Sequence, residues 1–213
     1  PLRMRRGELA ADLAGVLRGS LWGRATAGSA VLAAVLAAVF RVEAWQFSLE
    51  RPAEPLGALC ETLSPDERAR AARFVHGIHR DRYVVGRATL RRRLARLTGR
   101  DPRDIAFDYG PQGKPALADG PEFNLSHSGA RAVLAVSGDG PLGVDIEQHA
   151  PVEDGVAQRF FSPREYAALS GLAPEAWRAG FYRCWTRKEA VIKALGQGLS
   201  MPLDSFDVTL GPE

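Results

Sequence analysis

The hydrophobic positions of this chain follow two different periods. Short runs that alternate loosely or are rich in β-branched residues predict strands. Leucines at helical spacing among arginines, as at Leu90, Leu94 and Leu97, predict helices. We expect strands at residues 42–50, 104–109, 123–126, 132–136, 142–147 and 205–210. We expect helices at residues 65–75, 81–98, 153–161, 163–170 and 175–195.

Start and stop signals agree with several of these helices. Ser64 precedes Pro65 and stands three residues before Glu67, which is the pattern of a capping box. Gly99 and Gly196 follow predicted helices, where glycine commonly ends them. Helices and strands are segregated rather than strictly alternating, which favours an α+β fold with antiparallel sheets. The order also suggests two halves that meet near residue 141.

The first 41 residues stand apart from this pattern. Residues 25–40 form an alanine-rich apolar run behind several arginines, which is the charge order of a secretory signal. However, Arg41 and Glu43 follow at once, no clear cleavage site does, and the run is short for a membrane span. Because alanine favours helix over strand, we interpret the run as a packed helix or as sequence outside the working protein, without a stable membrane anchor.

The composition is that of an ordinary globular protein. The chain has 213 residues, of which 46% are hydrophobic and 25% charged, and a formal net charge of +3. The positive excess indicates either a solvated arginine-rich surface or one that attracts acidic partners or phosphates. The two cysteines, Cys60 and Cys184, belong to no metal-binding motif and fit free thiols in the cytoplasm.

Two acidic residues on one predicted strand form the first candidate site. Asp145 and Glu147 are two residues apart in the sequence GVDIE, so they point to the same side of a strand. Neighbouring carboxylates repel each other unless a cation lies between them, and oxygen ligands without Cys or His suit Mg²⁺. The alternative is a solvent-facing strand that carries two acids.

The predicted helix over residues 175–195 carries a second candidate site. Glu189 and Lys193 are four residues apart and share a helix face, and Trp185 lies one turn earlier. The functional interpretation makes Glu189 a third oxygen ligand or a base and places Lys193 on a phosphate. The alternative is a surface ion pair of little energetic weight.

Two further motifs carry weaker signals. In FNLSHS, Ser126 and His127 either meet a ligand at the end of a strand or complete a hydrogen-bonded turn. In the loop GKP, Lys114 either supplies a point charge for a phosphate or lies in solvent. The chain has no P-loop, Rossmann or hydrolase-elbow motif.

Taken in order, the motifs GKP, FNLSHS, GVDIE and WTRKEAVIKALGQGL resemble the 4′-phosphopantetheinyl transferase superfamily, most closely its surfactin-synthetase-type branch. The resemblance runs from about Leu59 to Leu210. It implies two similar α+β halves that form a pseudo-dimer, over residues 42–140 and 141–213, preceded by an extension over residues 1–41. Members of that branch continue for several more strands, so we expect the second half to be truncated.

The resemblance also implies roles for individual residues. The Mg²⁺ ligands of the family correspond to Asp145, Glu147 and Glu189. Glu189 is also the proposed base, and Lys193 matches the lysine that contacts the transferred phosphate. Trp185 and Lys188 match positions that shape the site. Contacts to coenzyme A are expected from Arg70, Arg82, Lys114, Ser126, His127 and Lys193.

The implied activity is that of a holo-acyl-carrier-protein synthase. Such an enzyme moves the phosphopantetheine arm of coenzyme A to a serine of an acyl or peptidyl carrier protein and releases 3′,5′-ADP. The carriers of fatty-acid, polyketide and nonribosomal peptide biosynthesis all fit. We expect a monomer that binds no nucleic acid, with a basic or hydrophobic face toward the carrier. The arginine-rich helix at residues 81–98 is a candidate for that face.

Two alternatives belong to other functional classes. A non-catalytic nucleic-acid-binding protein would use Arg91, Arg92 and Arg93, but it leaves the carboxylates unexplained and lacks the usual recognition motifs. A degenerate family member would act only as a carrier-binding module. The retained acidic residues and Lys193 argue against loss of the site.

Overall fold

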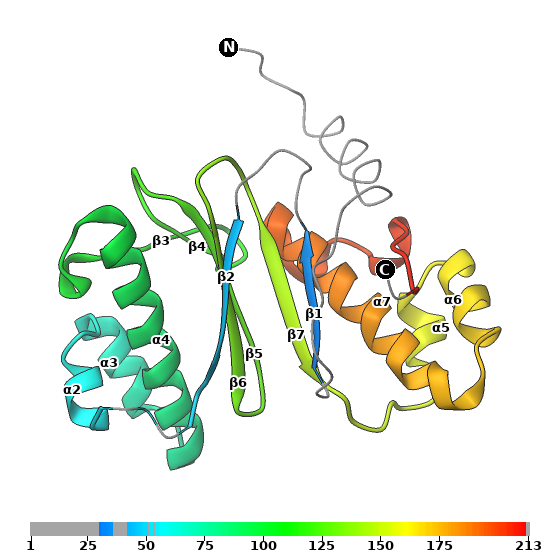
Figure 1. The fold of residues 1–213 in the computed structure, drawn as a ribbon, viewed down its shortest axis with the longest axis horizontal. Helices are drawn as coiled ribbons and strands as arrows, with labels where there is room; N and C mark the ends of the chain where they lie inside the picture. Colours follow the sequence, from blue (N-terminus) through cyan, green and yellow to red (C-terminus); the bar gives the residue numbers. More distant parts are fainter. Residues whose placement is uncertain (1–29, 36–41, 51, 53, 212–213) are drawn as a thin grey trace, which may run out of the picture.

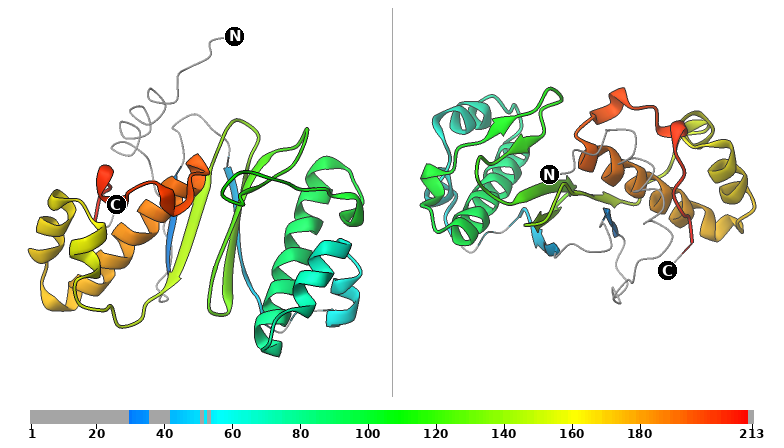
Figure 2. Two further views of the ribbon diagram at one scale, coloured as in Figure 1. Left: turned by 180° about the vertical axis from the view of Figure 1, so that it is seen from behind. Right: turned by 90° about the horizontal axis from the view of Figure 1, so that it is seen from above.

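The computed structural model describes residues 30–35, 42–50, 52 and 54–211. Two groups of helices lie at opposite ends of the molecule, and the strands stand between them (Figures 1 and 2). The first group contains α2 (Leu56–Cys60), α3 (Pro65–Ala72) and α4 (Gly77–Thr98). The second contains α5 (Val156–Phe160), α6 (Pro163–Ser170) and α7 (Pro174–Leu195). The fold therefore mixes helices with antiparallel strands, as the sequence predicts.

A three-stranded antiparallel sheet forms the centre of the N-terminal part. Its order is β2 (Val42–Ser48), β6 (Arg131–Ser137) and β5 (Glu122–Ser128). Leu134 of β6 pairs with Trp45 on one side and with Leu125 on the other. Gly129 adopts a φ of 56°, which lets the chain turn between β5 and β6. Two short strands, β3 (Asp108–Tyr109) and β4 (Pro115–Ala116), form a separate ladder.

Helix α4 supplies much of the N-terminal core. Leu90 and Leu94 are fully buried and pack in one cluster with Leu134 of β6. The apolar face of α4 therefore fixes the position of this helix on the sheet.

The predicted capping box of α3 is present, since the backbone N–H of Ser64 donates to Glu67 at 3.0 Å.

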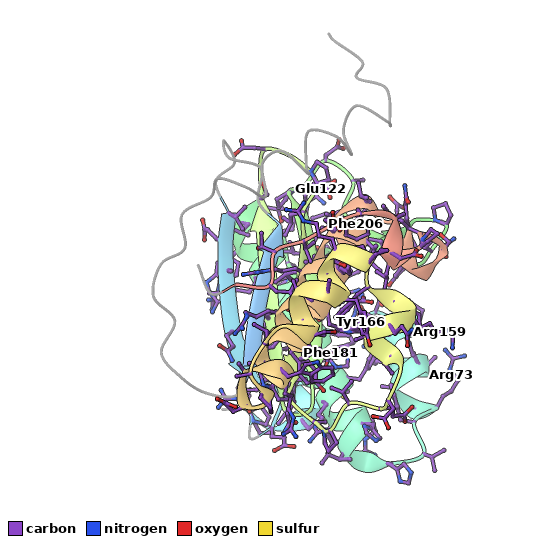
Figure 3. The ribbon with its side chains drawn as sticks, turned by 90° about the vertical axis from the view of Figure 1, so that its right-hand side faces the viewer. Arg73, Glu122, Arg159, Tyr166, Phe181 and Phe206 are labelled. Atoms are coloured by element: carbon purple, nitrogen blue, oxygen red, sulfur yellow. The ribbon has the colours of Figure 1, made fainter. Side chains whose placement is uncertain are left out.

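Helix α7 packs closely against β7 (Gly143–Gln148) in the C-terminal part. A Cβ at Gly143 would lie 2.0 Å from the carbonyl oxygen of Ala190, so only glycine allows this approach. The other side of α7 contributes to an apolar cluster rich in aromatic residues. Figure 3 shows two of them, Phe181 of α7 and Phe206 of the C-terminal segment, toward opposite ends of this cluster. The contact between β7 and α7 brings the acidic strand next to Glu189.

The alanine-rich run contains a strand where a packed helix was expected. Its described part is β1 (Ala30–Val35), which pairs antiparallel with β7. Backbone hydrogen bonds along the edge of β7 outweigh the helix preference of alanine here. The rest of residues 1–41 lies outside the described residues.

The predicted strand at residues 205–210 is not formed. The segment begins in a 3₁₀ turn at Leu203–Ser205 and continues without regular structure. Side chains form hydrogen bonds with the backbone of this segment. Val208 N donates to Glu165 at 2.6 Å, and Arg183 donates to the carbonyl of Leu210 at 2.6 Å. These bonds replace the ladder that a strand would need.

Other element boundaries differ by a few residues. The strand predicted at residues 104–109 is reduced to β3, because Pro102–Asp104 forms a 3₁₀ turn. The helix predicted at residues 153–161 is reduced to α5, because Gly155 adopts a φ of 80° at its start. Helix α4 begins four residues earlier than expected, α3 ends three residues earlier, and α2 was not predicted.

Two other sequence expectations concern cysteines and membranes. Cys60 and Cys184 are both free, which confirms the expected thiols. Within the part of the chain that the structure describes, no helix combines the length and hydrophobicity needed to cross a bilayer.

Candidate active site

The candidate site forms where β5 meets β7. In the described sheets these strands share no backbone ladder, and polar side chains of β5 join them instead. Asn124 Oδ1 accepts from the backbone N–H of Val144 at 2.9 Å, and Ser126 Oγ donates to Asp145 Oδ1 at 2.6 Å. Because alternate strand residues share a side, FNLSHS turns Asn124, Ser126 and Ser128 toward β7.

Asp145 is the most buried acid of this cluster, at 2% exposure. Its Oδ1 accepts from Ser126 and lies 2.5 Å from Lys193 Nζ, which also donates to Ser126 Oγ at 3.0 Å. Its Oδ2 is buried without a hydrogen-bond partner among the described residues. Such an oxygen is costly to bury, which indicates that a ligand from outside the chain completes the site.

Two further carboxylates face the same cluster. Glu147 accepts from Ser128 Oγ at 2.7 Å, and Glu189 approaches from α7. Burial raises the pKa of Glu189; Lys193 opposes this shift, and the like charges of Asp145 and Glu147 add to it. The structure thus brings the three predicted acids and the predicted lysine into one neighbourhood.

A cavity of about 530 Å³ lies beside these groups. Its wall carries the basic side chains of Arg70, His79, Arg82, Arg87 and His127. Aromatic and aliphatic side chains such as Phe74, Tyr83 and Leu125 line the rest. Desolvation lowers the pKa of His127, and the charge of Lys193 lowers it further while Glu147 opposes. His127 therefore lines the cavity and, although solvent-exposed, lies within electrostatic range of the carboxylates.

The cavity arginines are held by neighbouring side chains. Arg82 donates to Glu50 at 2.5 Å, and the guanidinium of Arg70 lies 5.5 Å from the ring centre of Tyr83. A second cavity, of about 590 Å³, shares Arg82, and its other charged lining residues are the acids Glu50, Glu54 and Asp81. Its charge makes it the less suitable of the two for a phosphate.

Lys114 lies near the cavity but directs its ammonium elsewhere. The Nζ atom donates to the carbonyl oxygens of Leu142 and Ala194, each at 3.1 Å. Desolvation lowers its pKa. Its neighbours Gly113 and Pro115 line the cavity. In this structure Lys114 therefore ties the loop to the C-terminal end of α7.

Lys188 and Trp185 contact the C-terminal core rather than the carboxylate cluster. Lys188 is fully buried and pairs with Glu165 at 2.7 Å. Trp185 packs against Phe160 and Phe181, with ring centres 5.8 and 5.9 Å away. Both residues therefore help to hold α7 in place on the C-terminal core.

Sequence reasoning passed over three polar residues of this region. In FNLSHS, alternation on a strand places Asn124 and Ser128 on the side of Ser126, although the motif itself singles out only Ser126 and His127. Arg87 is one of many arginines on its helix, yet it lines the cavity and pairs with the buried Glu67. No local sequence signal distinguishes Arg87 from its neighbours.

A cavity with basic side chains, near one buried aspartate, two half-buried glutamates and a lysine, suits a phosphorylated ligand. Comparison with known proteins gives the family. Residues 141–213 match the 4′-phosphopantetheinyl transferase superfamily, and residues 43–139 match the N-terminal part of 4′-phosphopantetheinyl transferase.

Characterised relatives agree with this assignment. The 4′-phosphopantetheinyl transferase HetI of Nostoc sp. is 42% identical over 178 residues, which are 80% of this chain and 75% of that protein. The 4′-phosphopantetheinyl transferase Sfp of Bacillus subtilis is 39% identical over 150 residues, which are 70% of this chain and 66% of that protein. The chain belongs to the 4′-phosphopantetheinyl transferase superfamily, which confirms the resemblance and the transferase class.

Proposed function

We propose that this chain transfers the phosphopantetheine arm of coenzyme A to a serine of an acyl or peptidyl carrier protein. The names of its relatives support the transfer. The observation that carries the proposal is the pairing of Lys193 with Asp145 beside a basic cavity. Residues 42–140 and 141–213 would act as two similar halves of a cytoplasmic monomer.

The chemistry of the three acids in this region suits a divalent cation. Within the described residues, no group of three or more Asp, Glu, His or Cys side chains is placed so that it could hold a metal ion. However, Asp145 Oδ2 lacks a partner, and Glu189 has no hydrogen-bond partner among the described side chains. Hard oxygen donors of this kind suit Mg²⁺. Asp145, Glu147 and Glu189 would hold the ion, which would offset the charge of the diphosphate.

The remaining residues have distinct tasks in the transfer. Arg70, Arg82 and His127 would bind the nucleotide end of coenzyme A in the cavity, and Lys193 would contact the transferred phosphate. Glu189 would take the proton of the carrier serine, directly or through water. The serine oxygen then bonds to the β-phosphorus, and the bond to 3′,5′-ADP breaks.

The three arginines of α4 that a nucleic-acid-binding protein would use are each engaged by another residue of the chain. Arg91 is buried and pairs with Glu67, and Arg92 pairs with Glu54. Arg93 lies over the ring of Trp45, 4.9 Å from its centre. Intramolecular contacts therefore account for all three side chains.

Mass spectrometry of an apo-carrier protein tests the proposal. Incubation with the chain, coenzyme A and Mg²⁺ should add one phosphopantetheine to the carrier serine. Asp145→Ala should abolish this gain while the circular dichroism spectrum stays that of a folded protein. A carrier that gains no mass with the wild-type chain would refute the activity.

A further inference from the structure

Ser128, the last residue of β5, makes two hydrogen bonds to β7. Its Oγ accepts from the backbone N–H of Gln148 at 3.0 Å and donates to Glu147 at 2.7 Å. A serine hydroxyl has one proton, so accepting from the main chain directs that proton to the carboxylate. The geometry fixes one oxygen of Glu147 and leaves the other available.

We propose that Ser128 is a positioning residue that holds the Glu147 carboxylate in the orientation needed to bind Mg²⁺. This inference rests on the proposed function, because it assigns Glu147 to the metal. Hydrogen bonds to metal-ligating carboxylates are part of a metal site, and their loss weakens metal affinity by about 10–100-fold. Ser128 meets that description through a direct bond to Glu147.

The contact between β5 and β7 explains why a residue that positions Glu147 is needed. Asn124 ties the start of β7 through Val144, and Ser128 ties its end through Gln148. Between these two points no described backbone ladder fixes the separation of the strands. The ladder with β1 and the packing on α7 place β7 itself, and side chains of β5 add the hydrogen bonds that orient its two carboxylates.

Repulsion within the cluster makes the restraint necessary. Asp145 and Glu147 are alternate residues on one side of β7, and α7, which carries Glu189, packs against that strand. Before a cation binds, Glu147 is free to rotate away from the other two unless a donor holds it. Ser126 and Lys193 hold Asp145, and Ser128 does the same for Glu147.

The test measures Mn²⁺ affinity by electron paramagnetic resonance in protein saturated with coenzyme A. Ser128→Ala should weaken Mn²⁺ binding by about 10–100-fold. Ser128→Thr keeps a hydroxyl and should restore most of the affinity. Ser137→Ala is the control, since Ser137 is also a strand serine, 2% exposed, and its Oγ accepts from the backbone N–H of Asp139 rather than from β7.

Each outcome separates the positioning role from the activity. Wild-type affinity in Ser128→Ala, in a chain that transfers phosphopantetheine, overturns the positioning role alone. Equal weakening in Ser128→Ala and Ser137→Ala shows a general loss of stability and also overturns it. A wild-type chain that neither binds Mn²⁺ nor transfers overturns both. If Ser128→Ala does not fold, Ser128→Cys, a weaker donor, must weaken Mn²⁺ binding more than Ser128→Thr does.

Discussion

Lys193 Nζ lies 2.5 Å from Asp145 Oδ1, so a lysine neutralises the carboxylate that we propose as a metal ligand. The lysine side chain is 29% exposed and the aspartate side chain 3% exposed. The lysine is therefore the more exposed partner. With a divalent cation at Asp145, Lys193 would be available to contact a bound phosphate, which would link metal loading to substrate binding.

Lys193→Met should separate these two roles. Loss of the ammonium leaves Asp145 buried without its cation, so thermal unfolding without Mg²⁺ should show a loss of about 1–3 kcal/mol. Mg²⁺ should then stabilise the variant more than the wild type, because the ion no longer competes with lysine. Transfer should fall by about 10²–10³-fold. Equal Mg²⁺ stabilisation of both proteins would contradict this relationship.

Gly143 sets the distance between β7 and α7. A Cβ at this position would meet the backbone of Ala190 and Ala194 at 2.0 and 2.4 Å, and backbone cannot rotate away. Gly143→Ala should therefore cost about 1–3 kcal/mol in urea unfolding and lower transfer by displacing the acids from Glu189. Gly138→Ala is the control, because nothing lies within 4 Å of a Cβ there. Equal stability of the two variants would show that β7 can shift freely.

Lys188 is a buried anchor for the C-terminal segment. Its ammonium pairs with Glu165 at 2.7 Å and donates to the carbonyl oxygens of Leu203 and Phe206, each at 2.6 Å. Lys188→Ala leaves Glu165 uncompensated and should lower the free energy of unfolding by about 3–5 kcal/mol. Arg164→Ala should change it little, since that side chain is 82% exposed. A small effect of Lys188→Ala in denaturant titrations would contradict the anchoring role.

His127 should make the free energy of unfolding depend on pH, and the sign of this dependence follows from the direction of its pKa shift. Desolvation and Lys193 lower its pKa, so below about pH 6.5 the folded chain binds fewer protons than the unfolded chain. Because the side chain is also solvent-exposed, the effect on stability should be small. The free energy of unfolding should therefore fall as the pH drops from about 6.5 through the folded pKa. His127→Gln should reduce this fall, measured by urea unfolding across that range. An unchanged pH profile in His127→Gln would show that the histidine is not desolvated.

The acids of the site were predictable because their spacing carries the information. Asp145 and Glu147 must share a side of any strand, and Glu189 and Lys193 must share a face of any helix. Lys188 shows the limit of this reasoning. It is adjacent to Glu189 in sequence, yet one residue turns it to the opposite, buried side of α7. Only tertiary packing decides which face of a helix is covered.

The fold shows the same division between local and long-range information. The capping box at Ser64 and Glu67 is local, and it is present as predicted. Strand β1 depends on the edge of β7, more than a hundred residues away, so helix propensity gave the wrong answer for Ala30–Val35. The missing strand at residues 205–210 has the same cause, because contacts from α6 and α7 replace a strand partner.

The most direct test of the account is the location of the metal. Crystals of the chain with coenzyme A and Mn²⁺, measured for anomalous scattering, should show one peak ligated by Asp145, Glu147 and Glu189, next to the diphosphate. A peak held by other residues, or coenzyme A bound in the basic cavity with no metal at these three acids, would contradict the central claim.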